Sequence, residues 1–470
     1  MFSAAKTSGP SGYTINNSVR LRSSASAYLN RTPASAGSQT TWTWSGWVKR
    51  GALSAVGRFM SAGSAASDQF GFTASDTFQF MSDTTGQNLV TTQVFRDPSA
   101  WYHFVIVLDS TQATAANRAK IYVNGSQVTA LSTATYPAQN STTLINGNTA
   151  QNIGRRLQTA GEYFDGYLSE VNFIDGQALT PSSFGSTNTT TGVWQPAKYT
   201  GTYGTNGFYL QFSNIATTSG SNTGLGKDFS GNGNYWTTNN ISVTTGTTYD
   251  AMIDSPTMGA SGTQPVGNYA VLNPLYTNSS GSIINALTNG NLKLSTATSN
   301  TLSTSTIAMP NNTTNKWYCE MICTLNGGGA PMIGITQPNS QSLGSSTYKC
   351  VSYRSNGSVE VNGTTVASGL SSFTTGDTLS MAVDMTTSGG QITFYKNNAS
   401  VYTVTGLNSQ FSGLDIVFGC QTNTASTTTW DANFGQRPFA YTPPNGYVAL
   451  CTTNLPDSTV KKGNIYMDAT

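Results

Sequence analysis

Apolar residues occur in short runs along the chain, separated by Ser, Thr, Asn and Gly. In residues 41–48, alternation places Trp42, Trp44 and Val48 on one face of a strand. Residues 101–108 are apolar on both faces, which predicts a central strand covered on both sides. No segment carries a long helical period. The pattern therefore predicts many short strands, as in sandwiches and barrels.

Two hairpins are predicted from their turn residues. Residues 120–123 lead into Asn124-Gly125, and residues 391–395 turn in the same way at Lys396-Asn397-Asn398. Asn and Gly tolerate the positive φ angles that tight hairpin turns require. The two similar hairpins indicate two β modules of similar size.

The chain is predicted to be all-β, with two β-sandwich (jelly-roll) domains joined by a connector rich in Gly, Asn, Ser and Thr. The expected parts are an N-terminal arm (1–12), a first sandwich (13–212), the connector (213–267), a second sandwich (268–455) and a tail or the start of a further module (456–470).

Charge excludes several classes of protein. Of the 470 residues, 9% are charged and the formal net charge is +2. The Lys and Arg residues are scattered rather than gathered into the basic stripe that a nucleic-acid binder needs. No apolar run approaches the length of a membrane span, and the N-terminus lacks the apolar core of a secretory signal. We expect neither nucleic-acid binding nor membrane insertion.

The residue types that support catalysis are sparse. The five cysteines form no C-x-x-C pair, and we expect them to be buried free thiols: Cys319, Cys323, Cys350, Cys420 and Cys451. The single histidine, His103, lies in an apolar strand, which predicts a buried, hydrogen-bonded ring. Glu170 and Glu320 fall in predicted strands, where they would face solvent or pair with a neighbour.

One segment offers oxygen groups at alternate positions, as the front of a calcium loop does: Asp228, Ser230 and Asn232, followed by Gly233. The twelfth position, where a bidentate acid is expected, is Asn239. With one carboxylate the affinity for calcium would be poor. We therefore expect an Asn/Gly-rich turn and no cofactor, and keep calcium as the alternative reading.

The first module resembles laminin-G-like, concanavalin-type jelly rolls. The matching motifs are residues 42–48 (WTWSGWV), 101–105 (WYHFV), 120–125 (KIYVNG) and 164–171 (FDGYLSEV). Some relatives of this kind are glucanases, but their Glu-x-Asp-x-x-Glu strand is absent from this sequence. Because this motif is absent, we expect no catalytic residues and no enzymatic activity.

The second module resembles a SPRY-type sandwich, through residues 316–320 (KWYCE), 376–379 (GDTL), 392–397 (ITFYKN) and 433–439 (NFGQRPF). The order of all these motifs is similar to that in large virion proteins of tailed bacteriophages. This resemblance implies localisation in the virion, as part of a tail or capsid fibre, and a homo-oligomer, with a trimer expected.

A concanavalin-type fold suggests sugar binding, in which an aromatic face stacks on the sugar and amides and hydroxyls surround it. The candidates lie in polar segments: Tyr235, Trp236, Tyr199 and Tyr203. The alternative for them is packing at the domain interface. The expected partners are host-surface glycan and other virion proteins, and the alternative function is an architectural adaptor or decoration protein that contacts only other virion proteins.

Overall fold

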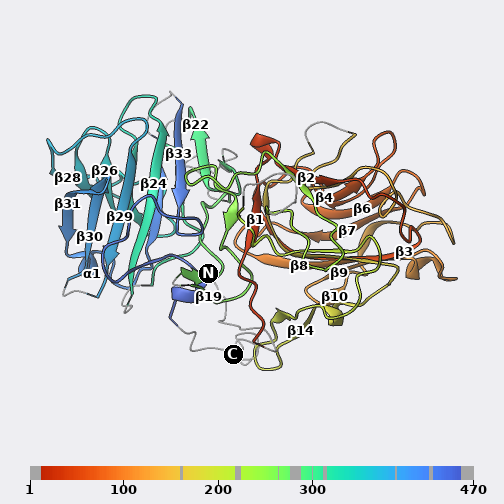
Figure 1. Cartoon of the computed structure of the whole chain (residues 1–470). Coiled ribbons are helices and arrows are strands. Elements are labelled where there is room, and N and C mark those ends of the chain that lie inside the picture. Colours follow the sequence, from red (N-terminus) through yellow and green to blue (C-terminus); the bar gives the residue numbers. More distant parts are fainter. Residues whose placement is uncertain are drawn as a thin grey trace. The chain divides into compact units, whose positions relative to one another are not determined.

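The computed structural model describes residues 12–158, 162–216, 224–262, 264–275, 287–298, 300–310, 315–386, 389–422 and 427–456. The chain divides into two compact units (Figure 1). Unit 1 holds the described residues up to Thr244 together with Thr248–Gly267, and unit 2 holds Thr245–Thr247 and the described residues from Asn268 onward. Both are built from sheets whose strands pair almost entirely in the antiparallel sense, which confirms the predicted all-β fold of two sandwiches.

Unit 1 contains two large sheets, which we call sheets I and II. Sheet I runs β10 (Ser126–Gln127), β9 (Ala119–Val123), β8 (Trp101–Asp109), β3 (Thr41–Arg50), β13 (Gly166–Asp175), β1 (Ser18–Leu21) and β18 (Ala251–Met252), with β16 (Phe208–Leu210) also paired to β13. Sheet II runs β11 (Leu131–Thr135), β7 (Asn88–Val94), β6 (Thr77–Ser82), β5 (Asp68–Phe72), β4 (Gly57–Ala62), β12 (Gln151–Ile153), β2 (Tyr28–Arg31) and β17 (Thr237–Asn239). Two small ribbons pair β14 (Gly185–Thr187) with β15 (Trp194–Pro196) and β19 (Gly259–Ser261) with β20 (Gln264–Val266).

Unit 2 also contains two large sheets, III and IV. Sheet III runs β21 (Leu287–Thr288), β22 (Lys293–Thr296), β33 (Thr428–Asn433), β24 (Lys316–Leu325), β29 (Thr378–Asp384), β30 (Gln391–Lys396) and β31 (Ala399–Thr405), with β34 (Tyr447–Ala449) paired to β24. Sheet IV runs β23 (Leu302–Thr304), β32 (Val417–Gln421), β25 (Met332–Thr336), β26 (Cys350–Arg354), β27 (Val359–Val361) and β28 (Thr364–Ala367).

Helical structure in the described residues is limited to α1 (Leu407–Gln410) and the 3-10 turns η1 (Ser23–Ala25), η2 (Ala115–Asn117), η3 (Pro181–Ser183) and η4 (Thr452–Asn454). None of these helices is long and apolar enough to cross a membrane.

Aromatic rings fill the space between sheets I and II. Trp42, Trp44 and Val48 are fully buried there, as the alternation predicts. The Trp42 ring lies 6.4 Å from that of Phe70 on sheet II. A Cβ atom at Gly46 would come within 2.5 Å of the Trp44 indole, so this position accommodates only glycine.

The outer face of sheet I is covered as well. Val105 and Val107 on β8 pack there with Ile174, Phe184 and Tyr199. The prediction of a central strand buried on both faces is therefore confirmed. Phe184 and Tyr199, which follow β13 in the chain, cover the side chains of β8 and β13 that point away from the core between sheets I and II.

Part of the predicted connector belongs to unit 1. Thr237–Asn239 pairs with β2 in sheet II, and Ala251–Met252 pairs with β1 in sheet I. Backbone hydrogen bonds form the ladder, so Gly/Asn/Ser/Thr-rich sequence can add short strands without an alternating apolar pattern. The exact domain boundaries remain a prediction.

Both predicted hairpin turns are present. Asn124 and Gly125 between β9 and β10 have φ angles of 47° and 84°, and Asn397 and Asn398 between β30 and β31 have 48° and 70°. The five cysteines are free and buried, as expected. Burial raises the pKa of the Cys323 thiol to about 12, which keeps it protonated.

Candidate functional site

The clearest exposed aromatic candidate lies on residues 228–236, which we call the Tyr235 loop. Asp228, 5% exposed, forms its base. Its Oδ1 accepts hydrogen bonds from the backbone N–H groups of Tyr209 and Ser230, both at 2.8 Å. Its Oδ2 accepts hydrogen bonds from Ser230 Oγ and the Asn234 N–H, also at 2.8 Å. Four donors therefore fix the start of the loop.

These contacts favour the interpretation that the segment from Asp228 to Asn234 is a turn over the alternative that it is a calcium-binding loop. Both oxygens of Asp228 and the Ser230 hydroxyl are engaged within the loop. Asn232 directs its Nδ2 group to the Gly204 and Gly207 carbonyls, at 2.7 and 2.9 Å. Among the described residues, no group of three or more His, Cys, Asp or Glu side chains is placed to hold a metal ion.

Asparagine side chains tie the loop to the segment before β16. Asn234 donates through Nδ2 to the Thr205 and Gly207 carbonyls, at 2.9 and 2.8 Å. Arg31 on β2 donates to Asn234 Oδ1. Because every one of these partners belongs to unit 1, the loop is held on the sandwich from several directions.

Tyr235 and Trp236 are adjacent in sequence but lie in different environments. Trp236 is 1% exposed, and its ring meets that of Phe208 edge-on at 4.9 Å. The structure thus corrects the expectation that Trp236 is a sugar platform: burial leaves its ring no face open to solvent. Tyr235 is 38% exposed, and its backbone N–H donates to the Gly233 carbonyl at 2.9 Å.

Tyr199 and Tyr203 pack on the outer face of sheet I. Tyr199 is 8% exposed and stacks on Phe184 at 5.3 Å. Tyr203 meets Tyr199 edge-on at 5.1 Å, and its hydroxyl donates to Asn172 Oδ1 at 2.8 Å. Both rings therefore have a packing role within unit 1, and Tyr199 offers little surface to a ligand.

A buried carboxyl group, that of Glu170, lies beside these rings. Glu170 lies in a β-bulge of β13 with φ of 51° and is 7% exposed, so it does not face solvent. Its Oε1 accepts hydrogen bonds from Tyr13 at 2.6 Å and from Tyr209 at 2.7 Å. Burial raises the pKa of Glu170 to about 7, against the opposing effect of these two hydroxyls.

Glu320 is likewise buried, on β24, and accepts hydrogen bonds from the backbone N–H groups of Ala440 and Tyr441. For both glutamates the predicted pairing with a neighbour holds and solvent exposure does not. A sequence pattern gives no sign of the bulge at Glu170, because a bulge depends on pairing with distant strands.

His103 is 1% exposed, as predicted, and hydrogen-bonded on both nitrogens. Trp194 Nε1 donates to its Nδ1 at 3.0 Å, so in the neutral ring Nε2 carries the proton and donates to Ser45 Oγ at 2.9 Å. Burial lowers the His103 pKa to about 3. The ring is therefore neutral at physiological pH and has a structural role.

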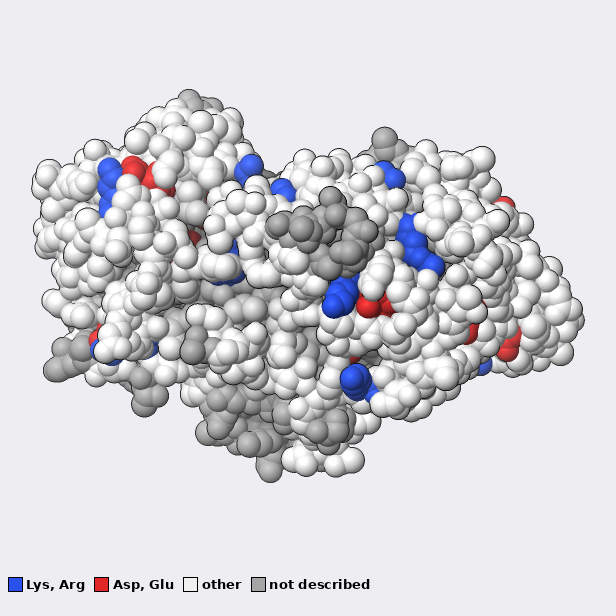
Figure 2. Space-filling view, in the orientation of Figure 1, with Lys and Arg blue, Asp and Glu red and all other residues white. Residues whose placement is uncertain are grey.

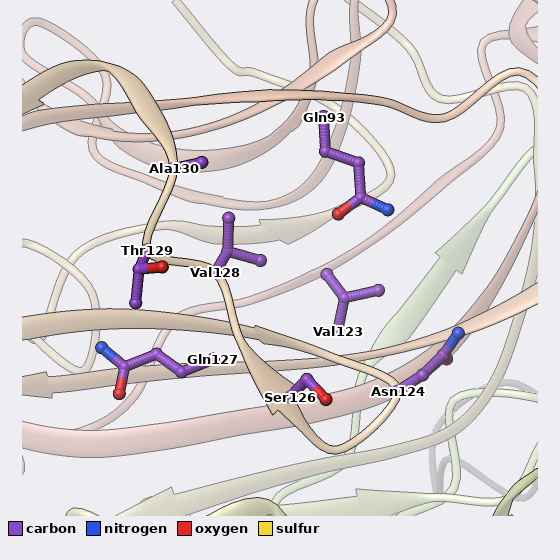
Figure 3. A pocket seen from close by; sticks show the side chains of 8 residues that line it. All are labelled: Gln93, Val123, Asn124, Ser126, Gln127, Val128, Thr129 and Ala130. Atoms are coloured by element: carbon purple, nitrogen blue, oxygen red, sulfur yellow. The ribbon is translucent and has the colours of Figure 1, made fainter. Parts of the chain in front are cut away.

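A surface hollow of about 380 Å³ lies where strands of sheets I and II come together (Figure 3). Val123 and Val128 supply its apolar part, and the remaining lining is polar or small: Gln93, Asn124, Ser126, Gln127, Thr129 and Ala130. None of the lining side chains is aromatic. The hollow therefore lacks the ring platform that the Tyr235 loop offers.

Comparison with known proteins supports the reading of unit 1. Residues 23–184 match the profile of a family described as the concanavalin A-like lectin/glucanases superfamily. No curated protein matches the chain. The Tyr235 loop lies outside the matched residues but is part of the same unit.

Several solved structures are similar to parts of the chain. A heptameric SAP-like pentraxin from Limulus polyphemus is 14% identical over 36% of this chain and 80% of its own, with a TM-score of 0.28. A putative carbohydrate binding protein from Bacteroides ovatus is 17% identical over 48% of this chain and 59% of its own, with a TM-score of 0.32. The SPRY domain of human HERC1 is 16% identical over 29% of this chain and 84% of its own, with a TM-score of 0.24. Over residues 23–184, unit 1 is therefore similar to domains of the concanavalin A-like lectin/glucanases superfamily, on the strength of the family profile.

Proposed function

We propose that this protein is a bacteriophage virion structural protein, part of a tail or capsid fibre, that binds host-surface carbohydrate through loops of unit 1. The observation that carries the binding part is the exposed Tyr235 ring on a loop fixed to a lectin-type sandwich. The virion part rests on the resemblance of the motif order to phage proteins. The proposed role is binding rather than catalysis.

The chemistry of the Tyr235 loop suits a sugar. A tyrosine ring offers an apolar face for the C–H groups of a pyranose and a hydroxyl at its edge. The Asn232 amide oxygen can accept hydrogen bonds from sugar hydroxyls, and the hydroxyl of exposed Thr205 can donate or accept them. Because Asp228 and Asn234 hold the loop in place, little conformational entropy is lost on binding.

The surface charge favours a neutral glycan. Figure 2 shows basic and acidic side chains, singly or in small groups of opposite charge, separated by wide uncharged areas on the face in view. The chain carries 22 Lys and Arg against 20 Asp and Glu. A polyanionic ligand would require clustered positive charge, so sugar hydroxyls are the better match for such a surface.

A single site of this kind is expected to bind weakly. A symmetric homo-oligomer, with three copies in a fibre, would present several sites to one cell surface and raise the overall avidity. Sedimentation equilibrium of the purified chain tests this part: a trimer is expected, and a monomer at micromolar concentration contradicts it.

The binding proposal is tested on a glycan array with the wild-type chain and two variants. Tyr235→Ala should lose most of the signal on glycans that the wild type binds, whereas Tyr235→Phe, which keeps the ring, should retain it. Equal signals from wild type and Tyr235→Ala would exclude this loop as the site. No signal from the wild type, combined with antibody labelling of virions by an antiserum against the chain, would favour the adaptor or decoration role.

A further inference from the structure

Unit 2 presents a sheet face with mixed aromatic and polar character. On sheet III, Tyr447 is paired with Lys316, Lys316 with Asp384, and Asp384 with Gln391. Residues paired directly across strands share a face. These four side chains therefore form one row across β34, β24, β29 and β30.

Further along β30, Thr393 and Tyr395 lie on the same face as Gln391, because alternate residues of a strand point to the same side. The intervening Ile392 and Phe394 are fully buried in the core. Tyr395 and Tyr447 are both partly exposed. Tyr447 lies close enough to Lys316, Asp384 and Tyr395 for their charges to act on the pKa of its hydroxyl, which burial raises.

Another part of the same face is closed. The Phe439 ring meets Tyr318 edge-on at 4.9 Å, and the backbone of Ala440 and Tyr441 binds Glu320. The part over β30 and β31 remains accessible, because Thr403 and Thr405 are exposed. The two partly exposed tyrosines therefore border an open polar surface.

The two charged groups of this surface form an ion pair with no net charge. Lys316 Nζ lies 2.9 Å from Asp384 Oδ2, with the Lys316 side chain 34% exposed and the Asp384 side chain 1% exposed. The Thr393 and Thr403 hydroxyls are 2.9 Å apart and share a hydrogen bond. The surface thus offers one paired ammonium, an amide and hydroxyls, but no net charge.

We propose that this face, formed by Lys316, Gln391, Tyr395, Thr403 and Tyr447, is a second carbohydrate subsite that takes a neutral pyranose. This inference rests on the proposed function and extends it from unit 1 to unit 2. The half-buried Tyr395 ring supplies a stacking surface. The Lys316 ammonium, which lies 5.7 Å from the centroid of the Tyr447 ring, and the Gln391 amide suit neighbouring sugar hydroxyls. An anionic ligand would find its attraction to Lys316 largely cancelled by Asp384. Two subsites on one chain would also raise avidity for a polymeric glycan.

The test is site-resolved nitration of the full chain by tetranitromethane, with and without methyl glucoside, methyl galactoside, methyl mannoside or N-acetylglucosamine. Peptide mass spectrometry then measures the nitration of each tyrosine. We expect at least one sugar to slow nitration of Tyr395 and Tyr447. Tyr402, paired across β30–β31 with the core residue Phe394, is the control and should react at an unchanged rate.

Variants give a second readout. Tyr395→Ala should weaken the sugar protection of Tyr447 by about tenfold in apparent affinity, whereas Tyr395→Phe should preserve it. A sugar that protects Tyr235 but leaves Tyr395 and Tyr447 unprotected would overturn the second subsite and leave the proposed function intact. Protection of Tyr395 without Tyr235 would support the second subsite and contradict the Tyr235 site. Protection of neither would overturn both.

Discussion

At the scale of single residues, two residues that are adjacent in sequence differ in burial. Tyr235 and Trp236 share a polar sequence context, yet one is exposed and the other is packed on Phe208. The sequence identified both as aromatic candidates but could not separate them, because the burial of Trp236 depends on β16, a strand some 25 residues earlier in the chain. By contrast, Trp42 and His103 lie in strands whose own pattern predicts their burial.

Truncation of the two aromatic residues should separate these roles. Trp236→Ala should lower the free energy of unfolding by about 3–5 kcal/mol, because it empties a large core volume. Tyr235→Ala should change it by less than about 0.5 kcal/mol, since its ring is partly exposed. Urea unfolding followed by fluorescence measures both. Equal losses would show that Tyr235 is also a packing residue.

Glu170 should make unit 1 less stable as the pH rises. Its pKa is raised from 4.5 to about 7 by burial, so the folded state holds its proton more tightly than the unfolded state does. Its contribution to stability is therefore complete below pH 4.5 and is lost as the pH rises through 7, for a total of about 3 kcal/mol.

The variant Glu170→Gln tests this contribution, since the amide keeps the shape and stays neutral. Urea midpoints measured between pH 5 and pH 8 should fall for the wild type relative to Glu170→Gln. Asp415→Asn, at an exposed position in unit 2, is the control and should follow the wild type. Parallel curves for wild type and Glu170→Gln would mean that Glu170 ionises normally.

At the scale of elements, the Tyr235 loop should be independent of calcium. Asp228 accepts four hydrogen bonds from its own chain, which leaves no carboxylate oxygen without a donor. Thermal unfolding should therefore be unchanged by EDTA or by millimolar calcium. Asp228→Ala should lower the free energy of unfolding by about 1–3 kcal/mol, because the buried Tyr209 N–H loses its acceptor. A rise in Tm on adding calcium would restore the metal reading.

The turn between β9 and β10 should require glycine for two reasons. Gly125 has φ of 84°, and a Cβ atom there would lie 2.3 Å from the Trp194 ring. Gly86 has a similar φ of 68°, but a Cβ atom there would meet nothing within 4 Å. Gly86→Ala should therefore cost about 1–2 kcal/mol of stability from backbone strain alone, and Gly125→Ala should cost more. Equal costs would show that the Trp194 ring moves aside freely.

Among the elements, sequence pattern predicted the strands that have their own alternation or turn signal, such as β3, β8 and the β9–β10 hairpin. It missed β17 and β18, which are two or three residues long and exist because sheets II and I offer them an edge. The bulge at Glu170 was missed for the same reason: its geometry belongs to the pairing of β13 with β3, not to the local sequence.

At the scale of the whole molecule, the low charge of the sequence was the most informative property, because it does not depend on which strands pair. It excluded a basic groove before the fold was known, and Figure 2 shows only scattered charges on the face in view. It could not locate a site, since hydroxyl and amide groups occur along the entire chain. The Tyr235 loop could be located only when the structure showed which aromatic rings are buried in the core.

Glycan binding by the full chain should therefore resist salt. Exposed charges contribute little to recognition of a neutral sugar, so screening by added ions has little attraction to remove. We expect the dissociation constant to change by less than about twofold between 50 and 500 mM NaCl, whereas a protein that binds a polyanion through many charge contacts loses about 10³-fold or more over a smaller range. Titration of the chain with its best array glycan at both salt concentrations measures this. A steep loss of affinity would show that the ligand is an acidic polymer and that scattered Lys and Arg side chains, rather than tyrosine rings, hold it.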